Sequence, residues 1–94
     1  MVDWMLEVLH VLNQSDFVFL RSVSLLDQYF KRTKKVIDVT DLHLNGMVCM
    51  FIASKYEEIE PIKIRELIDD VGHFLFSKEH IQNKELDILS TLQF

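Results

Sequence analysis

The sequence predicts a single all-α domain of five helices, with the third helix at the centre. A chain of 94 residues, 49% of them hydrophobic, is long enough to bury one core but not two. Two Gly and one Pro provide too few turn-forming residues for a strand-rich fold. Apolar residues recur at the 3.6-residue spacing of amphipathic helices along most of the chain.

The first predicted helix runs from residue 1 to about residue 13 and is apolar around most of its circumference. Its polar residues follow one narrow stripe, at Asp3, Glu7, His10 and Gln14. We expect the core, a partner or both to cover the rest of this helix.

The second predicted helix follows Ser15 and Asp16, which suit the N-cap position. Its expected buried stripe consists of Phe19, Val23, Leu26 and Phe30. Asp27 lies at the edge of that stripe, and a lone buried carboxylate is costly without a partner. We therefore predict that Asp27 is a structural buried carboxylate.

The third predicted helix runs from about residue 41 to residue 58, with Asp38 or Thr40 as its N-cap. It is apolar on almost all sides, which is typical of a central helix. Gly46 costs about 1 kcal/mol relative to Ala within a helix, so we expect a neighbouring helix to approach closely there.

Two shorter helices complete the prediction. Pro61 suits the first turn of a fourth helix that reaches Asp70 and ends at Gly72. Its expected buried side consists of Ile64, Leu67, Ile68 and Val71. Ser77 suits the N-cap of a fifth helix, in which Glu85 occupies the same stripe as Ile81, Ile88 and Leu92.

Composition argues against several classes of protein. The net charge of −5 does not suit nucleic-acid binding, which usually needs a surplus of Lys and Arg. The longest apolar run, from Met47 to Ala53, is far shorter than the ~20 residues that span a membrane. We therefore expect neither a nucleic-acid partner nor a membrane-spanning segment.

No motif for catalysis, metal binding or cofactor binding stands out. The single cysteine, Cys49, excludes a disulfide within the chain and a zinc site made of several thiolates, and suits a reducing compartment. The four histidines lack the spacing of a metal motif, and no Gly-rich loop is present to bind phosphate. Glu57, Glu58 and Glu60 form an acidic cluster that is more typical of a solvated rim than of a catalytic pair. We predict no catalytic residue, no metal and no cofactor.

Glu85 needs an explanation because it interrupts an apolar stripe. Lys55, one turn before the end of the third helix, is a candidate partner. The pattern leaves two alternatives open: an ion pair within the chain, or a charged patch that binds another protein.

The chain resembles the cyclin family along its whole length, and the A- and B-type mitotic cyclins most. The segment from Met50 to Ile59, Met-Phe-Ile-Ala-Ser-Lys-Tyr-Glu-Glu-Ile, is similar to the central signature of the cyclin box. The first helix shares Val-Asp-Trp, the second contains Leu-Asp-Gln-Tyr-Phe where the family has Leu-Asp-Arg-Phe, and the third begins with Leu-His-Leu before Gly46. The segment from Glu85 to Leu89 resembles the fifth helix of the box.

This resemblance implies a regulatory subunit that binds a cyclin-dependent protein kinase and holds the mobile helix of that kinase in its active position. The expected kinase-binding residues are Lys55, Glu85, Ile52, Tyr56, Glu58, Leu89 and Phe94. A groove for substrates or inhibitors that carry a basic-x-Leu motif is expected at Met1, Trp4, Glu7 and Leu42. The resemblance also implies a location in the nucleus and cytoplasm, and no enzymatic activity of the chain itself.

The chain departs from the family pattern in three ways. It starts within the first helix of the box, so the Arg that pairs with the second-helix Asp is not matched, and residues 1–94 are expected to form one N-terminal-type box without a second box. His43 stands where the groove usually has Gln, and Gln28 stands where the second helix usually has Arg.

Two alternative functions share this fold, and the truncated start of the first helix favours the first of them. A pseudo-cyclin would keep the fold and bind partners without activating a kinase. A nucleic-acid-binding domain like that of general transcription factor B would share the fold, but the negative charge counts against it.

Overall fold

In the computed structural model, which describes residues 2–33, 38–71 and 76–92, the chain is helical and these residues form no strand. The helices are α1 (Val2–Val11), α2 (Asp16–Arg32), α3 (Val39–Glu57), α4 (Ile64–Glu66) and α5 (Lys78–Thr91), and a π-helical turn, η1 (Leu67–Val71), continues α4. The predicted all-α fold class is confirmed. None of the helices in these ranges has the length and apolar character needed to cross a membrane.

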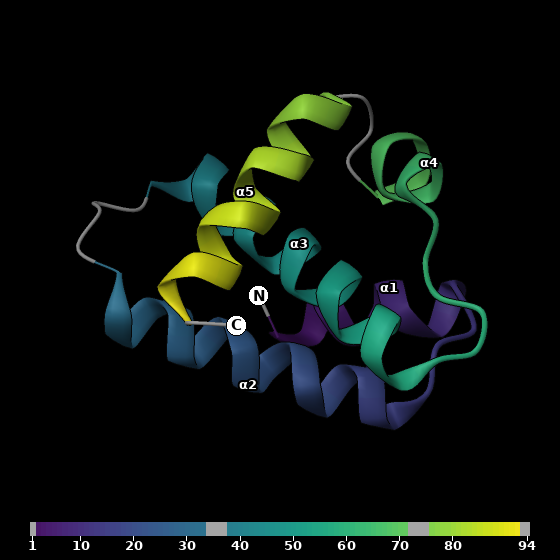
Figure 1. The fold of residues 1–94 in the computed structure, drawn as a ribbon. Coiled ribbons are helices and arrows are strands. Elements are labelled where there is room, and N and C mark those ends of the chain that lie inside the picture. The colour runs from purple at the N-terminus through teal and green to yellow at the C-terminus, as the bar shows by residue number, and fades with distance from the viewer. Residues whose placement is uncertain (1, 34–37, 72–75, 93–94) are drawn as a thin grey trace.

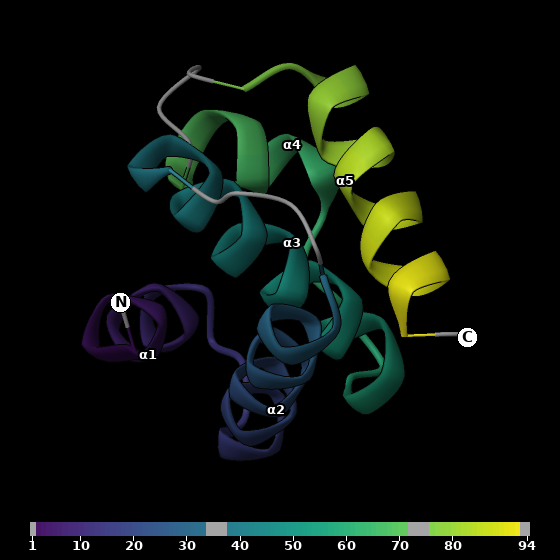
Figure 2. The ribbon, with the colours of Figure 1, turned by 90° about the vertical axis from the view of Figure 1, so that its left-hand side faces the viewer.

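The third helix lies at the centre of the domain, as predicted (Figure 1). Every residue from 44 to 54 is buried. Helix α2 makes the most extensive contact with α3, whereas α1 and α5 lie on opposite sides of it (Figure 2). A helix surrounded in this way has no polar face, which explains the apolar pattern of α3.

Helix α1 ends two residues earlier than predicted. Asn13 has a φ of 56°, a left-handed conformation that Asn tolerates better than most residues and that commonly terminates helices. The backbone N–H groups of Asn13 and Gln14 donate to the carbonyls of His10 and Leu9 at 3.1 and 2.9 Å, which closes the end of the helix. The fourth member of the predicted polar stripe, Gln14, therefore lies outside α1.

The prediction for Asp27 is wrong. Its side chain is 63% exposed and pairs with Lys31 at 3.1 Å, one turn along the same helix. The buried stripe of α2 is rotated from the predicted one and consists of Val18, Ser22, Leu25, Leu26 and Tyr29. Asp27 follows Leu25 by two residues, about 200° around the helix, so this rotation turns the carboxylate toward solvent, where it is hydrated.

Helix α3 begins at the first of the two predicted caps. The Asp38 carboxylate accepts a hydrogen bond from the Asp41 N–H at 2.8 Å, which satisfies one of the unpaired donors of the first turn. Further along the helix, Asn45 is fully buried, and its amide has no hydrogen-bond partner within the described part of the chain.

The fourth helix differs from the prediction and the fifth agrees with it. Pro61 precedes α4 instead of opening it, since the helix begins at Ile64. The Glu66 side chain accepts a hydrogen bond from the Lys63 N–H at 3.0 Å at the start of this helix. The predicted end at Gly72 lies outside the described residues. Ser77 caps α5 as predicted, with its hydroxyl accepting from the N–H of His80 at 3.2 Å.

A polar network that the sequence analysis missed fixes α5 against α2. The buried Tyr29 donates its hydroxyl hydrogen bond to the Asp87 carboxylate at 2.6 Å. Lys84 and Thr91 approach the same carboxylate at 3.4 and 3.5 Å. Because Asp87 lies close to Glu85 in sequence, this network also positions the charged residue that the sequence analysis singled out.

Candidate functional site

Lys55 and Glu85 come together at the surface where α3 meets α5. The Lys55 ammonium lies 2.5 Å from a Glu85 carboxylate oxygen, and the two side chains are 45% and 18% exposed. The ammonium also lies 4.1 Å from the centre of the Phe51 ring, within the range of a cation–π contact. Of the two alternatives left open by the sequence, the ion pair within the chain therefore forms, and it remains accessible from one side.

This pair retains hydrogen-bonding capacity toward a second molecule. An ammonium has three N–H donors, and the contact with Glu85 uses one of them. A half-exposed ion pair stabilises a fold by only about 0–1 kcal/mol. Its chemistry therefore suits recognition of polar groups on a partner better than it suits folding.

The other predicted kinase-binding residues differ in how far they are exposed at this surface. Tyr56 is 61% exposed beside Lys55, and the partly buried Leu89 lies one turn after Glu85 on α5. Ile52 belongs to the core, with 2% exposure, because α3 is surrounded at this point. Phe94 lies outside the described residues.

Two residues of the signature fix the end of α3. The Ser54 hydroxyl accepts from the Ile62 N–H at 3.1 Å and donates to the Phe51 carbonyl at 2.9 Å, so it ties the following loop to the helix. The Glu58 carboxylate accepts from the Ser15 N–H at 2.8 Å. Hydrogen bonds from the Ser15 side chain and backbone lower the pKa of Glu58. Glu58 therefore joins the end of α3 to the start of α2, a structural contact that the sequence analysis missed.

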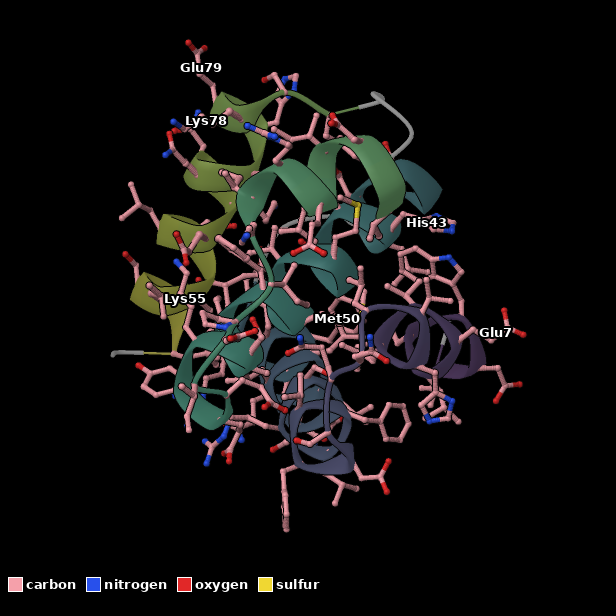
Figure 3. All side chains as sticks on the ribbon, turned by 90° about the vertical axis from the view of Figure 1, so that its right-hand side faces the viewer. Glu7, His43, Met50, Lys55, Lys78 and Glu79 are labelled. Carbon is pink, nitrogen blue, oxygen red and sulfur yellow. The ribbon has the colours of Figure 1, made fainter. Side chains whose placement is uncertain are left out.

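The predicted docking groove lies on the other side of α3. Figure 3 shows Glu7 and His43 on one side of the molecule and Lys55 on the opposite side. Met50 lies between these two sides. The partly buried Trp4 meets the His43 ring edge to face, with the ring centres 5.3 Å apart. Met1 lies outside the described residues.

A hollow of about 190 Å³ opens beside Trp4. It is lined by Trp4, Glu7, Val8, Val11, Leu12 and Val71. The predicted Leu42 is partly buried but is not part of this lining. Val11, which is 79% exposed, and Val71 were not predicted there, although the over-apolar first helix indicated a surface that a partner could cover.

The remaining reactive groups form no second site in the described ranges. Two residues of the acidic cluster have partners within the chain: Glu57 forms an ion pair with Arg21, and Glu58 accepts a hydrogen bond from Ser15. Burial raises the pKa of Cys49 to about 12, so its thiol stays protonated and is a poor nucleophile. Among the described residues, no group of three His, Cys, Asp or Glu side chains could hold a metal ion.

Comparison with known proteins identifies the family of the chain. A family profile described as "Cyclin, N-terminal domain" matches residues 1–94. Cyclin-A3-2 of Arabidopsis thaliana is 36% identical over 97 residues, which cover all of this chain and 24% of that protein. G2/mitotic-specific cyclin-B of Dictyostelium discoideum is 36% identical, and cyclin-B2-1 of Oryza sativa subsp. japonica is 31% identical, again over the whole chain and over 21% and 22% of those proteins.

The chain thus spans about a quarter of the length of these relatives. Both A-type and B-type cyclins are among them, in agreement with the resemblance of the signature segment. The chain therefore belongs to the cyclin family and matches the N-terminal cyclin domain along its entire length.

Proposed function

We propose that this cyclin-type regulator binds a cyclin-dependent protein kinase through the surface of α3 and α5 and holds the mobile helix of the kinase in its active position. The observation that carries the proposal is the accessible Lys55–Glu85 pair at the junction of the two helices. Catalysis takes place on the kinase, and the cyclin contributes only binding energy.

The geometry supports this proposal because the Lys55–Glu85 pair is fixed in position by neighbouring hydrogen bonds and is still exposed to a partner. The Tyr29–Asp87 contact fixes α5, and the Ser54 hydrogen bonds fix the end of α3, so the two charges are presented in one orientation. A preorganised polar pair loses little conformational freedom when a partner binds. The exposed Tyr56 supplies apolar area beside it.

A charge-reversal experiment separates binding from folding. Lys55→Ala or Glu85→Ala should weaken kinase binding by about 2–5 kcal/mol, measured by calorimetry, because one side of a desolvated charged contact is lost. The double variant Lys55→Glu with Glu85→Lys keeps the internal ion pair but reverses both charges, so it should remain folded by circular dichroism and still fail to bind.

The matched control is the exposed Asp27–Lys31 pair of α2, reversed in the same way. It should leave the kinase affinity unchanged. Normal binding by the Lys55–Glu85 reversal variant would remove this pair from the interface. Stimulation of peptide phosphorylation by the bound kinase then distinguishes a kinase activator from a pseudo-cyclin, which binds without stimulating.

We also propose that the hollow beside Trp4 docks substrates or inhibitors that carry a basic-x-Leu motif. The hollow of about 190 Å³ accepts an aliphatic side chain, and the exposed Glu7 attracts the basic residue. Titration of such a peptide should shift the indole NMR signal of Trp4 in the wild-type chain. Glu7→Gln should weaken that binding, and a titration that leaves Trp4 unchanged would contradict the proposal.

A further inference from the structure

The outer face of α2 carries an apolar surface that the core does not use. Phe17 and Leu20 are 70% and 62% exposed and lie three residues apart, so they share one face of the helix. Together with Arg21, Ser24 and Glu57 they line a surface hollow of about 320 Å³. Single exposed apolar side chains are common, but a neighbouring pair at a hollow indicates an interaction surface.

These two side chains are not required for folding. The buried stripe of α2, which includes Val18, Leu25 and Tyr29, already packs against α3 and α5. Substitutions of exposed residues away from that stripe usually change stability by less than about 0.5 kcal/mol. The face that carries Phe17 and Leu20 can therefore be altered without loss of the fold.

The hollow adjoins the surface of the Lys55–Glu85 pair. Arg21, at its edge, forms an ion pair with Glu57 and lies 5.8 Å from the centre of the Tyr56 ring. Tyr56 is exposed and directly follows Lys55 at the end of α3. One continuous path therefore leads from Lys55 through Tyr56 and Arg21 to the hollow on α2.

Charge indicates which occupant fits the hollow. Arg21 and Glu57 neutralise each other, so its edge offers an apolar contact without a local excess of charge. A second copy of this chain would bring together two molecules that each carry a net charge of −5, and like charges oppose such an association. The path through Tyr56 and Arg21 instead favours the protein that binds the adjoining Lys55–Glu85 surface.

We propose that Phe17 and Leu20 extend the kinase-binding surface onto α2, where the hollow receives an apolar side chain of the same kinase that binds Lys55 and Glu85. This inference rests on the proposed function. It adds a third helix to the interface and assigns a role to two exposed apolar residues that the sequence analysis did not single out.

The test compares Phe17→Gln and Leu20→Gln with the wild-type chain in calorimetric binding to a purified cyclin-dependent kinase. Each variant should weaken binding about five- to tenfold, as expected for the loss of a buried apolar anchor. The control is Val2→Gln, which removes an exposed apolar side chain from α1 and should bind as wild type. A photo-crosslinking residue in place of Leu20 should form a covalent adduct with the kinase.

Failure of this inference can be distinguished from failure of the proposed function. If Lys55→Ala weakens binding but both α2 variants bind as wild type, the extension onto α2 is wrong, whereas the proposed interface on α3 and α5 remains supported. If the wild-type chain fails to bind the kinase, the proposed function itself is wrong. Sedimentation that shows a wild-type dimer and monomeric α2 variants with unchanged kinase affinity would assign the hollow to a second copy and overturn the proposal.

Discussion

The two candidate surfaces lie on opposite sides of α3 and are held by different kinds of interaction. On one side, α5 adds directional contacts to the apolar packing of Ile81 and Ile88, namely the Lys55–Glu85 ion pair and the Tyr29–Asp87 hydrogen bond. On the other side, α1 is attached mainly by apolar packing of Met5 and Leu9. The edge-to-face contact of Trp4 with His43 adds one ring contact between α1 and α3.

This difference indicates how each surface is suited to its partner. Directional contacts fix the position of a helix, so the α3–α5 surface is preorganised for a partner whose own helix must be held in place. Apolar packing is less directional, so α1 can adjust to the side chain that enters its hollow. We therefore expect α1 to open locally before α5 does.

The largest expected effect tests this contrast at α1. Leu9→Ala removes a fully buried side chain and should destabilise the domain by about 2–5 kcal/mol in urea unfolding. Hydrogen exchange should accelerate first in α1, while α5 stays protected. Val2→Ala, at an exposed position of the same helix, should have little effect, and equal acceleration in both helices would contradict the contrast.

A smaller effect is expected on the α5 side. Tyr29→Phe removes the hydroxyl donor to Asp87 and should cost about 1–3 kcal/mol, because a partly buried carboxylate loses a hydrogen bond of 2.6 Å. Exchange should then accelerate in α5 and not in α1. An unchanged melting temperature for Tyr29→Phe would show that the hydrogen bond does not attach α5.

A stabilising change is expected within α3, in the half that carries His43. Asn45→Val replaces a fully buried amide that has no partner within the described ranges, so it should stabilise the domain by about 1 kcal/mol. Asn45→Ala removes the same amide but leaves a cavity, so it should stabilise less. A loss of stability in the Val variant would indicate that the amide forms a hydrogen bond, for which a bound water is the first candidate.

The smallest expected change in stability concerns Glu58 and depends on pH. The folded state lowers the pKa of Glu58, so this carboxylate stabilises the fold above its ordinary pKa, and that contribution is lost as the pH falls through the folded value. Glu58→Gln should therefore be less stable than wild type at pH 7, and the difference should disappear in acid. Urea unfolding at several pH values measures it, and a Ser15→Ala background should reduce it. A difference that persists in acid would contradict this role.

The helical pattern of this chain was predictable because helix formation and capping are largely local. The N-caps Asp38 and Ser77 accept hydrogen bonds from residues three positions along, and both were visible in the sequence. The apolar circumference of α3 likewise indicated a central helix. The signature resemblance identified Lys55 and Glu85, because their residue types and neighbouring motifs match a known pattern.

The errors arose where several helices together decide the outcome. The rotation of α2 that exposes Asp27 depends on how its side chains pack against α3 and α5, and a shift of about one residue turns this carboxylate from the predicted buried edge to solvent. Pro61 is equally acceptable in a loop or a first helical turn. The loop that follows α3 excludes it from α4, because the Ser54 hydroxyl binds the next residue, Ile62.

The sequence by itself therefore determined the fold class, the order of the helices and the identity of the two residues that form the central charged pair. Only the tertiary structure decided that Lys55 and Glu85, 30 residues apart, bind each other, that Glu58 binds Ser15 and that Phe17 and Leu20 share an exposed hollow. The physical reason is that periodicity records which face of a helix is apolar, whereas the partner of a charged or exposed side chain depends on how helices distant in sequence pack together.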